Sequence, residues 1–405
     1  MTRPDRFGIC SLGRRYRDRA RRLRDEGLFG YIRGQKGYVL VVVLLVVALL
    51  VSVSGEFLLT AQTNVHYARK FHERVAARSL SHTGLQMAVA ILEADKRGIA
   101  SGIMQGINSD TSTDSYFDLW ALEFPEIPME NGFIGISIED ENAKINLSVM
   151  ANEVVDQTPY YTITQRFFLN MGLPMDISDS LIDWVDIDDM HFPYGAESSD
   201  YYRNLNPPYS AKNAEMNSIG EMLLVKGITP EIYYGLGPVN ERSGPTVEHN
   251  RGNTSVDIGN LGKDGKGRGF IRKESARTAV SPPIGRERSR RLDRYFRVYG
   301  ERTDYLSQLN RININTASFR VLSSLSDDMT DDRVTEIIRR RQLKPFSSVD
   351  EVNDIITDET IRNNILTVRS FIFKIEATGR VNNTRVVTLT YYNREHKKYY
   401  YISEY

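Results

Sequence analysis

Six carboxylates within eighteen residues give the clearest chemical signal in the chain. They are Asp183, Asp186, Asp188, Asp189, Glu197 and Asp200, with Pro193 and Gly195 among them. So many negative charges on one folded loop repel one another, and Ca²⁺ relieves the repulsion because it accepts about 6–8 oxygen ligands from short irregular segments. The Asp-x-Asp pair at 186 and 188 brings two carboxylates within reach of one ion. The predicted calcium ligands are Asp186, Asp188, Asp189, Glu197 and Asp200.

Two other interpretations of this acidic segment compete with a calcium site. It can be a solvated acidic loop in which Asp183 caps a helix. It can also supply an acid–base pair for glycoside hydrolysis, but no aromatic-lined sugar cleft is discernible. Trp184 lies between Leu181 and Val185 and is better explained as a core residue. The calcium and solvated-loop interpretations both stay open.

The rest of the composition points away from catalysis. A single cysteine, Cys10, excludes an intramolecular disulfide and a cysteine-based zinc site. The six histidines are scattered, and none has the spacing of a metal-binding helix. Nucleotide-loop, nucleophile-elbow and kinase motifs are missing from the sequence, and Gly259–Gly269 reads as a flexible linker. We expect that the protein is not an enzyme.

The net charge of zero conceals two opposite blocks in the 405 residues. Residues 1–37 hold 11 basic and 4 acidic side chains, whereas residues 101–200 hold 19 acidic and only two basic ones, Lys144 and Arg166. A block that acidic repels the phosphate backbone of nucleic acids. No nucleic-acid partner is therefore expected.

A DNA-binding alternative comes from Ile312–Ile355. Its Asn315-Thr316-Ala317 start, amphipathic helix and Arg339–Arg341 run are similar to a helix–hairpin–helix of the competence DNA-receptor type. Such hairpins present backbone amides of a glycine loop to phosphate. The corresponding loop here, 326–332, has four acidic residues and no glycine. A membrane-anchored DNA receptor is accordingly the second choice, and a role in protein packing is preferred.

One apolar segment near the amino terminus is long enough to span a membrane. The run starts at Tyr38 and reaches about Phe57, which meets the ~20 helical residues that a bilayer core requires. A cleaved signal peptide fits less well, since the basic segment before the run is long and no small-x-small site follows. The excess of arginine before the span predicts a cytoplasmic amino terminus. The bulk of the chain is then expected in the periplasm of a Gram-negative bacterium.

The same helix is expected to continue well beyond the membrane. Apolar or small residues recur at steps of three, four or seven as far as Leu92, and no proline occurs between Pro4 and Pro125. One helix of ~58 residues, ~87 Å long, fits this pattern, with a break near Gly55 or Gly84 as the alternative. The residues predicted to face lipid or partner helices are Val42, Leu58, Val65, Leu80 and Ile91.

The junction before this helix resembles a type IV prepilin peptidase site. Cleavage after Gly37 would make Tyr38 the first mature residue. Pseudopilins normally have a glutamate five residues in, where this chain has Val42. Its absence is characteristic of the minor pseudopilins of the general secretion pathway protein K family, part of type II secretion. Three further segments resemble that family: Gly135–Leu147, Leu181–Asp189 followed by Gly195-Ala196-Glu197, and Ile312–Ala317.

The resemblance implies a structural role. A subunit of this family lies at the tip of a periplasmic pseudopilus, where it initiates assembly and supports protein export across the outer membrane. The partners implied are the minor pseudopilins of the I, J and H types, the inner-membrane secretion platform and the prepilin peptidase. The resemblance also points to calcium at the acidic segment. A single-pass protein of the bacterial inner membrane is expected.

The expected fold is α+β and pilin-like. A long transmembrane helix packs on a small antiparallel sheet, into which SAM-like or helix–hairpin–helix-like modules are inserted. Alternating residues predict one hairpin from 133–138 and 143–149 and another from 371–379 and 384–392. The expected segments are a cleaved basic cytoplasmic leader (1–37), a transmembrane helix (38–58), its periplasmic continuation with the first strands (59–150), a first helical module with the acidic loop (151–240), a flexible insertion (241–304), a second helical module (305–365) and the C-terminal strands (366–405).

Overall fold

The computed structural model describes residues 36–99, 110–151, 159–236, 291–301, 304 and 306–405. The chain falls into two units, one ending at Glu73 and the other beginning at Arg74. Most of the predicted leader, 1–37, and residues 241–290 of the predicted insertion lie outside the described residues.

Helix α3, Lys36–Lys96, is a single helix of 61 residues. It continues through both Gly55 and Gly84, so the predicted long helix is confirmed and the broken alternative is not. Its first half exposes large apolar side chains, among them Val43, Leu50 and Phe57. Within the described residues, α3 is the one helix long and apolar enough to cross a membrane.

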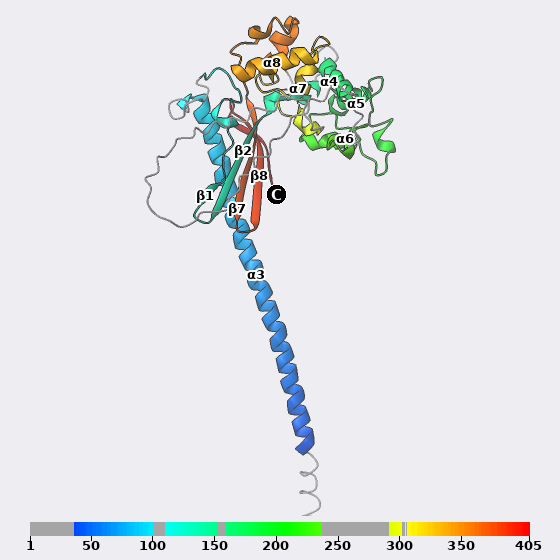
Figure 1. Ribbon diagram of the computed structural model, residues 1–405. Helices are drawn as coiled ribbons and strands as arrows, with labels where there is room; N and C mark the ends of the chain where they lie inside the picture. Colours follow the sequence, from blue (N-terminus) through cyan, green and yellow to red (C-terminus); the bar gives the residue numbers. More distant parts are fainter. Residues whose placement is uncertain (1–35, 100–109, 152–158, 237–290, 302–303, 305) are drawn as a thin grey trace, which may run out of the picture. The chain divides into compact units, whose positions relative to one another are not determined.

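A five-stranded antiparallel sheet forms the body of the second unit (Figure 1). Its strands, in spatial order, are β1 (Ile127–Met129), β2 (Gly132–Asp140), β7 (Ile372–Val381), β8 (Thr384–Asn393) and β9 (Lys398–Glu404). The predicted C-terminal hairpin is confirmed as β7 and β8, whose turn holds Asn382 at a φ of 51°.

The C-terminal part of α3 packs on this sheet. Leu85, Ala88 and Leu92 are buried against a cluster that includes Ile134 and Phe373. Helix α3 and strand β7 approach each other closely at Gly379, because glycine has no side chain. A Cβ at this position would lie only 1.9 Å from the backbone oxygen of Ala77. The Ser81 and Thr388 hydroxyls also meet, at 2.8 Å, in the buried contact between helix and sheet.

The predicted hairpin between 133–138 and 143–149 is wrong. Strand β2 pairs with β1 and β7, whereas β3, Ile145–Asn146, pairs in parallel with β4, Phe296–Arg297. The chain leaves the sheet because the Asp140 side chain accepts a hydrogen bond from the Asn142 backbone N–H and starts a 3-10 turn. Alternation alone could not reveal a partner strand 150 residues away.

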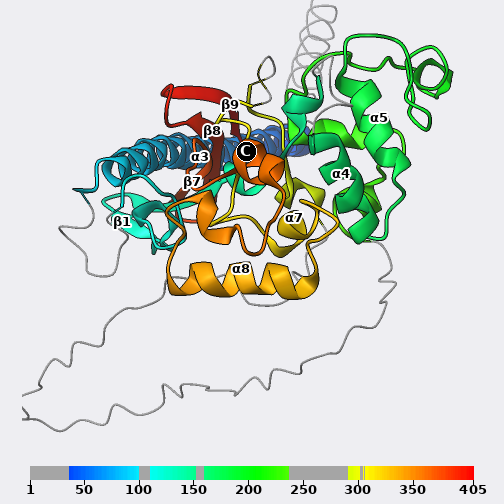
Figure 2. The same cartoon turned by 90° about the horizontal axis from the view of Figure 1, so that it is seen from above.

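Two helical modules lie side by side at one end of the sheet (Figures 1 and 2). The first contains α4 (Pro159–Asn170), α5 (Asp176–Val185) and α6 (Pro230–Tyr233), and the second contains α7 (Phe319–Ser323) and α8 (Asp331–Leu343). The second begins at β5 (Ile312–Asn313), which pairs in parallel with β6 (Leu366–Thr367). Both modules share one hydrophobic core, and Arg166 on α4 pairs with Asp327 at 2.6 Å.

The predicted flexible insertion, 241–304, extends too far toward the C-terminus, because its last part is folded into the core. Leu292, Tyr295 and Phe296 are buried in the core of the helical modules. Phe296 belongs to β4, and its ring lies 4.8 Å from that of Phe167 on α4. The aromatic side chains give this segment enough apolar surface to pack.

Candidate metal centre

Helix α5 positions the first two carboxylates of the acidic segment. Its apolar residues, Leu181 and Trp184 among them, are buried and fix the orientation of the helix. Asp183 lies in its last turn, and Asp186 is its C-cap, with a backbone N–H that donates to the Ile182 oxygen at 2.8 Å. The C-terminal end of a helix carries partial negative charge, so two carboxylates there repel it as well as each other. This arrangement favours a bound cation.

The loop after α5 folds back onto Asp183. The Phe192 backbone N–H donates to Asp183 Oδ1 at 2.9 Å. Gly195 lies so close that a Cβ there would be 1.7 Å from Asp183 Oδ2, which only glycine permits. The Lys226 ammonium holds the loop end by donating to the Gly195 oxygen at 2.8 Å.

Three oxygen atoms of this segment are buried and have no hydrogen-bond partner: Asp183 Oδ2, Asp186 Oδ1 and Glu197 Oε1. Their side chains are almost completely buried, since the exposed fractions of the three residues are 0%, 8% and 0%. Burial, reinforced by repulsion between these acids, raises the pKa of Asp183 to about 6, that of Asp186 to about 7 and that of Glu197 to about 8. Buried carboxylate oxygens without donors are the ligands that a hard cation such as Ca²⁺ accepts.

The predicted ligands divide into two groups. Asp186 and Glu197 are buried with unpartnered oxygens, whereas Asp188, Asp189 and Asp200 are exposed. One oxygen of each exposed residue accepts a hydrogen bond: from the Met190 N–H, from the Asn213 amide and from the Glu197 N–H, respectively.

Asp183 was missing from the predicted ligands, although it belongs to the acidic segment. The spacing of three residues to Asp186 could have revealed it, because residues three apart share a helix face. The sequence analysis counted Asp183 in the acidic segment and gave it a helix-capping role only in the solvated-loop alternative. In the structure it receives the Phe192 N–H with one oxygen and leaves the other unpartnered.

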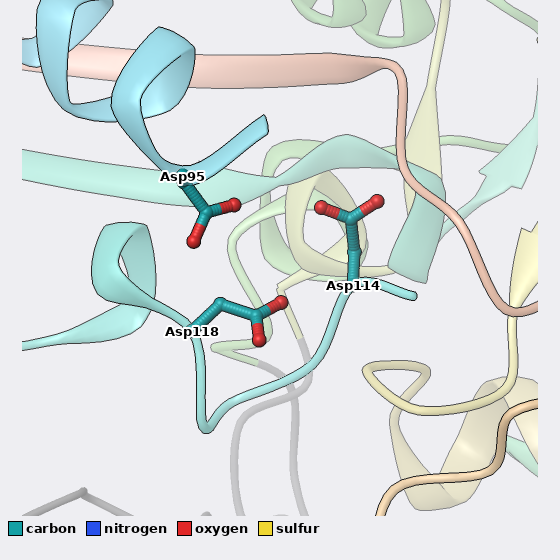
Figure 3. Close-up of side chains that lie close together, drawn as sticks. All are labelled: Asp95, Asp114 and Asp118. Carbon is teal, nitrogen blue, oxygen red and sulfur yellow. The ribbon is translucent and has the colours of Figure 1, made fainter. Parts of the chain in front are cut away.

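A second acidic cluster lies at the end of α3. Figure 3 shows the side chains of Asp95, Asp114 and Asp118 close together. One carboxylate oxygen of each lies within 4.8 Å of the others. A cation of the chain already pairs with two of these carboxylates: the Arg394 guanidinium contacts both Asp114 oxygens at 2.7 Å and Asp95 at 3.4 Å. The Asp118 carboxylate accepts the Ser115 N–H at 2.6 Å. We therefore interpret this cluster as an ion-pair network, not a metal centre.

The residues predicted for membrane and partner contacts lie along α3. Tyr38, which follows Gly37, is 71% exposed, and Val42, Leu58 and Val65 are also exposed. Leu80 and Ile91 are partly buried against the protein's own sheet core.

The basic residues of α8 are already engaged. Arg339 pairs with Glu336 at 2.7 Å, and Arg340 pairs with Asp354 at 2.6 Å. Arg341 is buried and donates to the Ile314 backbone oxygen. Nothing in this geometry supports the DNA-receptor alternative.

Comparison with known proteins identifies the two helical modules. Models described as "Type II secretion system (T2SS), protein K" match residues 143–239 and residues 312–364. These two modules are therefore similar to those of the type II secretion system protein K family. Both matched regions coincide with the inserted modules, and the predicted family resemblance is confirmed.

Curated members of the protein K family align with half of this chain. Type II secretion system protein K of Pectobacterium carotovorum subsp. carotovorum is 29% identical over 217 residues, covering 50% of this chain and 62% of its own length. The protein of the same name from Pseudomonas aeruginosa is 27% identical over 201 residues, covering 48% of this chain and 58% of its own. The matches therefore span less than two thirds of these relatives.

A solved structure shares the fold. It is the GspK-GspI-GspJ complex of the type 2 secretion system of enterotoxigenic Escherichia coli, in which one chain matches with a TM-score of 0.53. The match covers 85% of this chain and 99% of the other, at 15% identity. The predicted α+β fold, with a long apolar helix, an antiparallel sheet and inserted helical modules, is confirmed.

Proposed function

We propose that this chain is a minor pseudopilin, a structural subunit of the periplasmic pseudopilus that supports protein export and catalyses no reaction. The observation that carries the proposal is the combination of two protein K modules with a long apolar helix and an antiparallel sheet. Helix α3 would anchor the subunit in the inner membrane with its amino terminus in the cytoplasm.

The proposed partners are other minor pseudopilins of the I, J and H types. The structure that shares this fold is a complex of GspK with GspI and GspJ, which supports the first two. Assembly would also require the inner-membrane platform and the prepilin peptidase. Val42 stands where a pseudopilin normally has glutamate, and the first subunit of a pilus has no need to pair with the terminal amine of a neighbour.

The proposed position is the tip. Helices α4 to α8 gather at one end of the sheet, where their bulk would block the addition of another subunit above. We also propose that the acidic segment binds Ca²⁺ through Asp183, Asp186 and Glu197, because each has a buried carboxylate oxygen without a hydrogen-bond partner. A bound ion would supply the positive charge that this loop lacks.

Co-assembly tests the proposal. The full chain, expressed with I-type and J-type pseudopilins and a prepilin peptidase, is expected to co-elute with both after extraction in mild detergent. An unrelated single-pass protein of similar size is the control and should elute alone. The proposal fails if the I and J subunits elute together and this chain elutes without them.

A further inference from the structure

A network of buried polar side chains meets at Arg394, which follows β8 and is 5% exposed. Its Nη2 donates to both oxygens of Asp114 at 2.7 Å and to the backbone oxygen of Ser370 at 2.7 Å. Its Nη1 lies 3.4 Å from Asp95 Oδ2, at the end of α3. One guanidinium therefore joins α3, the segment after it and the two connections that flank β7 and β8.

The network continues into the second helical module. The Ser370 N–H donates to Asp114 Oδ2 at 2.7 Å, and its hydroxyl donates to Asp140 Oδ2 at 2.6 Å. The Thr316 hydroxyl, just before α7, donates to the same Asp140 oxygen at 2.5 Å. The Asn313 amide of β5 donates to the Ser370 hydroxyl at 2.7 Å. The first residues of the module are thus held by groups of the sheet.

The charges of this network are unequal. Asp95, Asp114 and Asp140 bring three carboxylates together, and Arg394 pairs with the first two of them. Asp140 is 3% exposed, and its carboxylate accepts hydrogen bonds from neutral donors: the Asn142 N–H and the hydroxyls of Thr316 and Ser370. Burial raises the pKa of Asp95 and that of Asp140 to about 6, so their charged forms are costly without a nearby cation.

We propose that Arg394 is the internal counter-ion of a latch that locks the second helical module onto the sheet. The latch consists of Asp95, Asp114, Asp140, Asn313, Thr316, Ser370 and Arg394. Since its cation is part of the chain, the latch needs no dissolved ion to stay closed. The module would then keep a fixed position on the body of the subunit.

Hydrogen exchange of the full chain in detergent tests the latch. Arg394→Gln removes the cation and leaves the carboxylates buried. Backbone amides in 313–317 and 368–371 are then expected to exchange about 100-fold faster, because breaking a buried ion pair shifts local opening by roughly that factor. Amides of α4 and α5 are expected to change little. The proposal is overturned if exchange accelerates uniformly, or if the latch segments exchange as in the unmodified chain.

Two further variants keep the test sharp. Lys96→Gln removes a nearby cation whose 2.9 Å pair with Glu395 is exposed, and it is expected to leave exchange in the latch unchanged. The double variant Asp114→Asn with Arg394→Gln removes a negative charge along with the positive one. The double variant is expected to restore much of the protection from hydrogen exchange that Arg394→Gln loses. If Arg394→Gln fails to fold, the double variant is expected to fold. A double variant no better protected than the single one would refute the counter-ion role.

Discussion

Calcium at 5 mM is expected to raise the unfolding temperature of the full chain by about 3 °C at pH 7.5. A ligand that binds only the folded state adds about 2 kcal/mol to the free energy of unfolding when its concentration is about 50 times Kd, which is within reach for sites of this kind. The unfolding entropy grows with chain length, so for the unit Arg74–Tyr405 a change of 1 kcal/mol corresponds to roughly 1.5 °C. Thermal unfolding in detergent, followed with calcium and with a chelator, measures the difference.

The pH dependence has a definite sign. The pKa is raised to about 6 for Asp183, about 7 for Asp186 and about 8 for Glu197, whereas the same carboxyls titrate near pH 4 in the unfolded chain. Without calcium, the stability these groups contribute is fully present below pH 4 and is lost as the pH rises through 6 to 8. Calcium competes with protons, so its stabilising effect is expected to be small at pH 5 and large at pH 8.

The variant Asp186→Asn distinguishes stabilisation by bound calcium from the general effect of removing a negative charge. It removes one uncompensated negative charge, so the unfolding temperature without calcium is expected to rise at pH 7.5, while the increase caused by calcium falls by more than half. Asp332→Asn, at an exposed position in the first turn of α8, is the matched control and should keep the full calcium response. Equal responses of the two variants would place any calcium elsewhere.

Assembly with partner subunits is expected to fail when a charge is placed on the apolar face of α3. Val65 is 61% exposed and lies beyond the apolar run, where a partner helix would cover it. An aspartate buried there without a partner costs about 3 kcal/mol or more, which weakens association at least about 100-fold. Val65→Asp is therefore expected to abolish co-elution with the I-type and J-type pseudopilins.

Thr63→Asp is the control for this experiment. Thr63 is exposed and lies roughly on the side of the helix opposite Val65. Its hydroxyl donates a hydrogen bond to the backbone oxygen of Leu59 in the same helix. It adds the same charge at nearly the same height. If both variants assemble normally, α3 does not contact partners at this level, and if both fail, the loss does not report on the apolar face.

The sequence predicted the elements whose signals are local. The apolar run from Tyr38 and its continuation to Leu92 predict α3, and the β-branched runs around Asn382 predict β7 and β8. It failed where partners are distant. Ile145–Asn146 pairs with Phe296–Arg297, and no local pattern reports a two-residue parallel bridge across 150 residues.

The candidate site shows the same limit. The acidic segment was visible because its carboxylates are close in sequence, yet burial decided which of them lack partners. Asp183 is such a residue, since Gly195 folds directly onto it. The Arg394 network could not be predicted, because its members come from Asp95 to Arg394 and only the folded chain brings them together.

The mass of the mature protein tests the central claim most directly. The full chain, expressed in a bacterium with an active prepilin peptidase and recovered from the membrane fraction, is measured intact and its amino-terminal peptide is sequenced. A pseudopilin is expected to begin at Tyr38, with or without a methyl group on its amine. A chain that still begins at Met1, while a co-expressed major pseudopilin is fully processed, would contradict the claim.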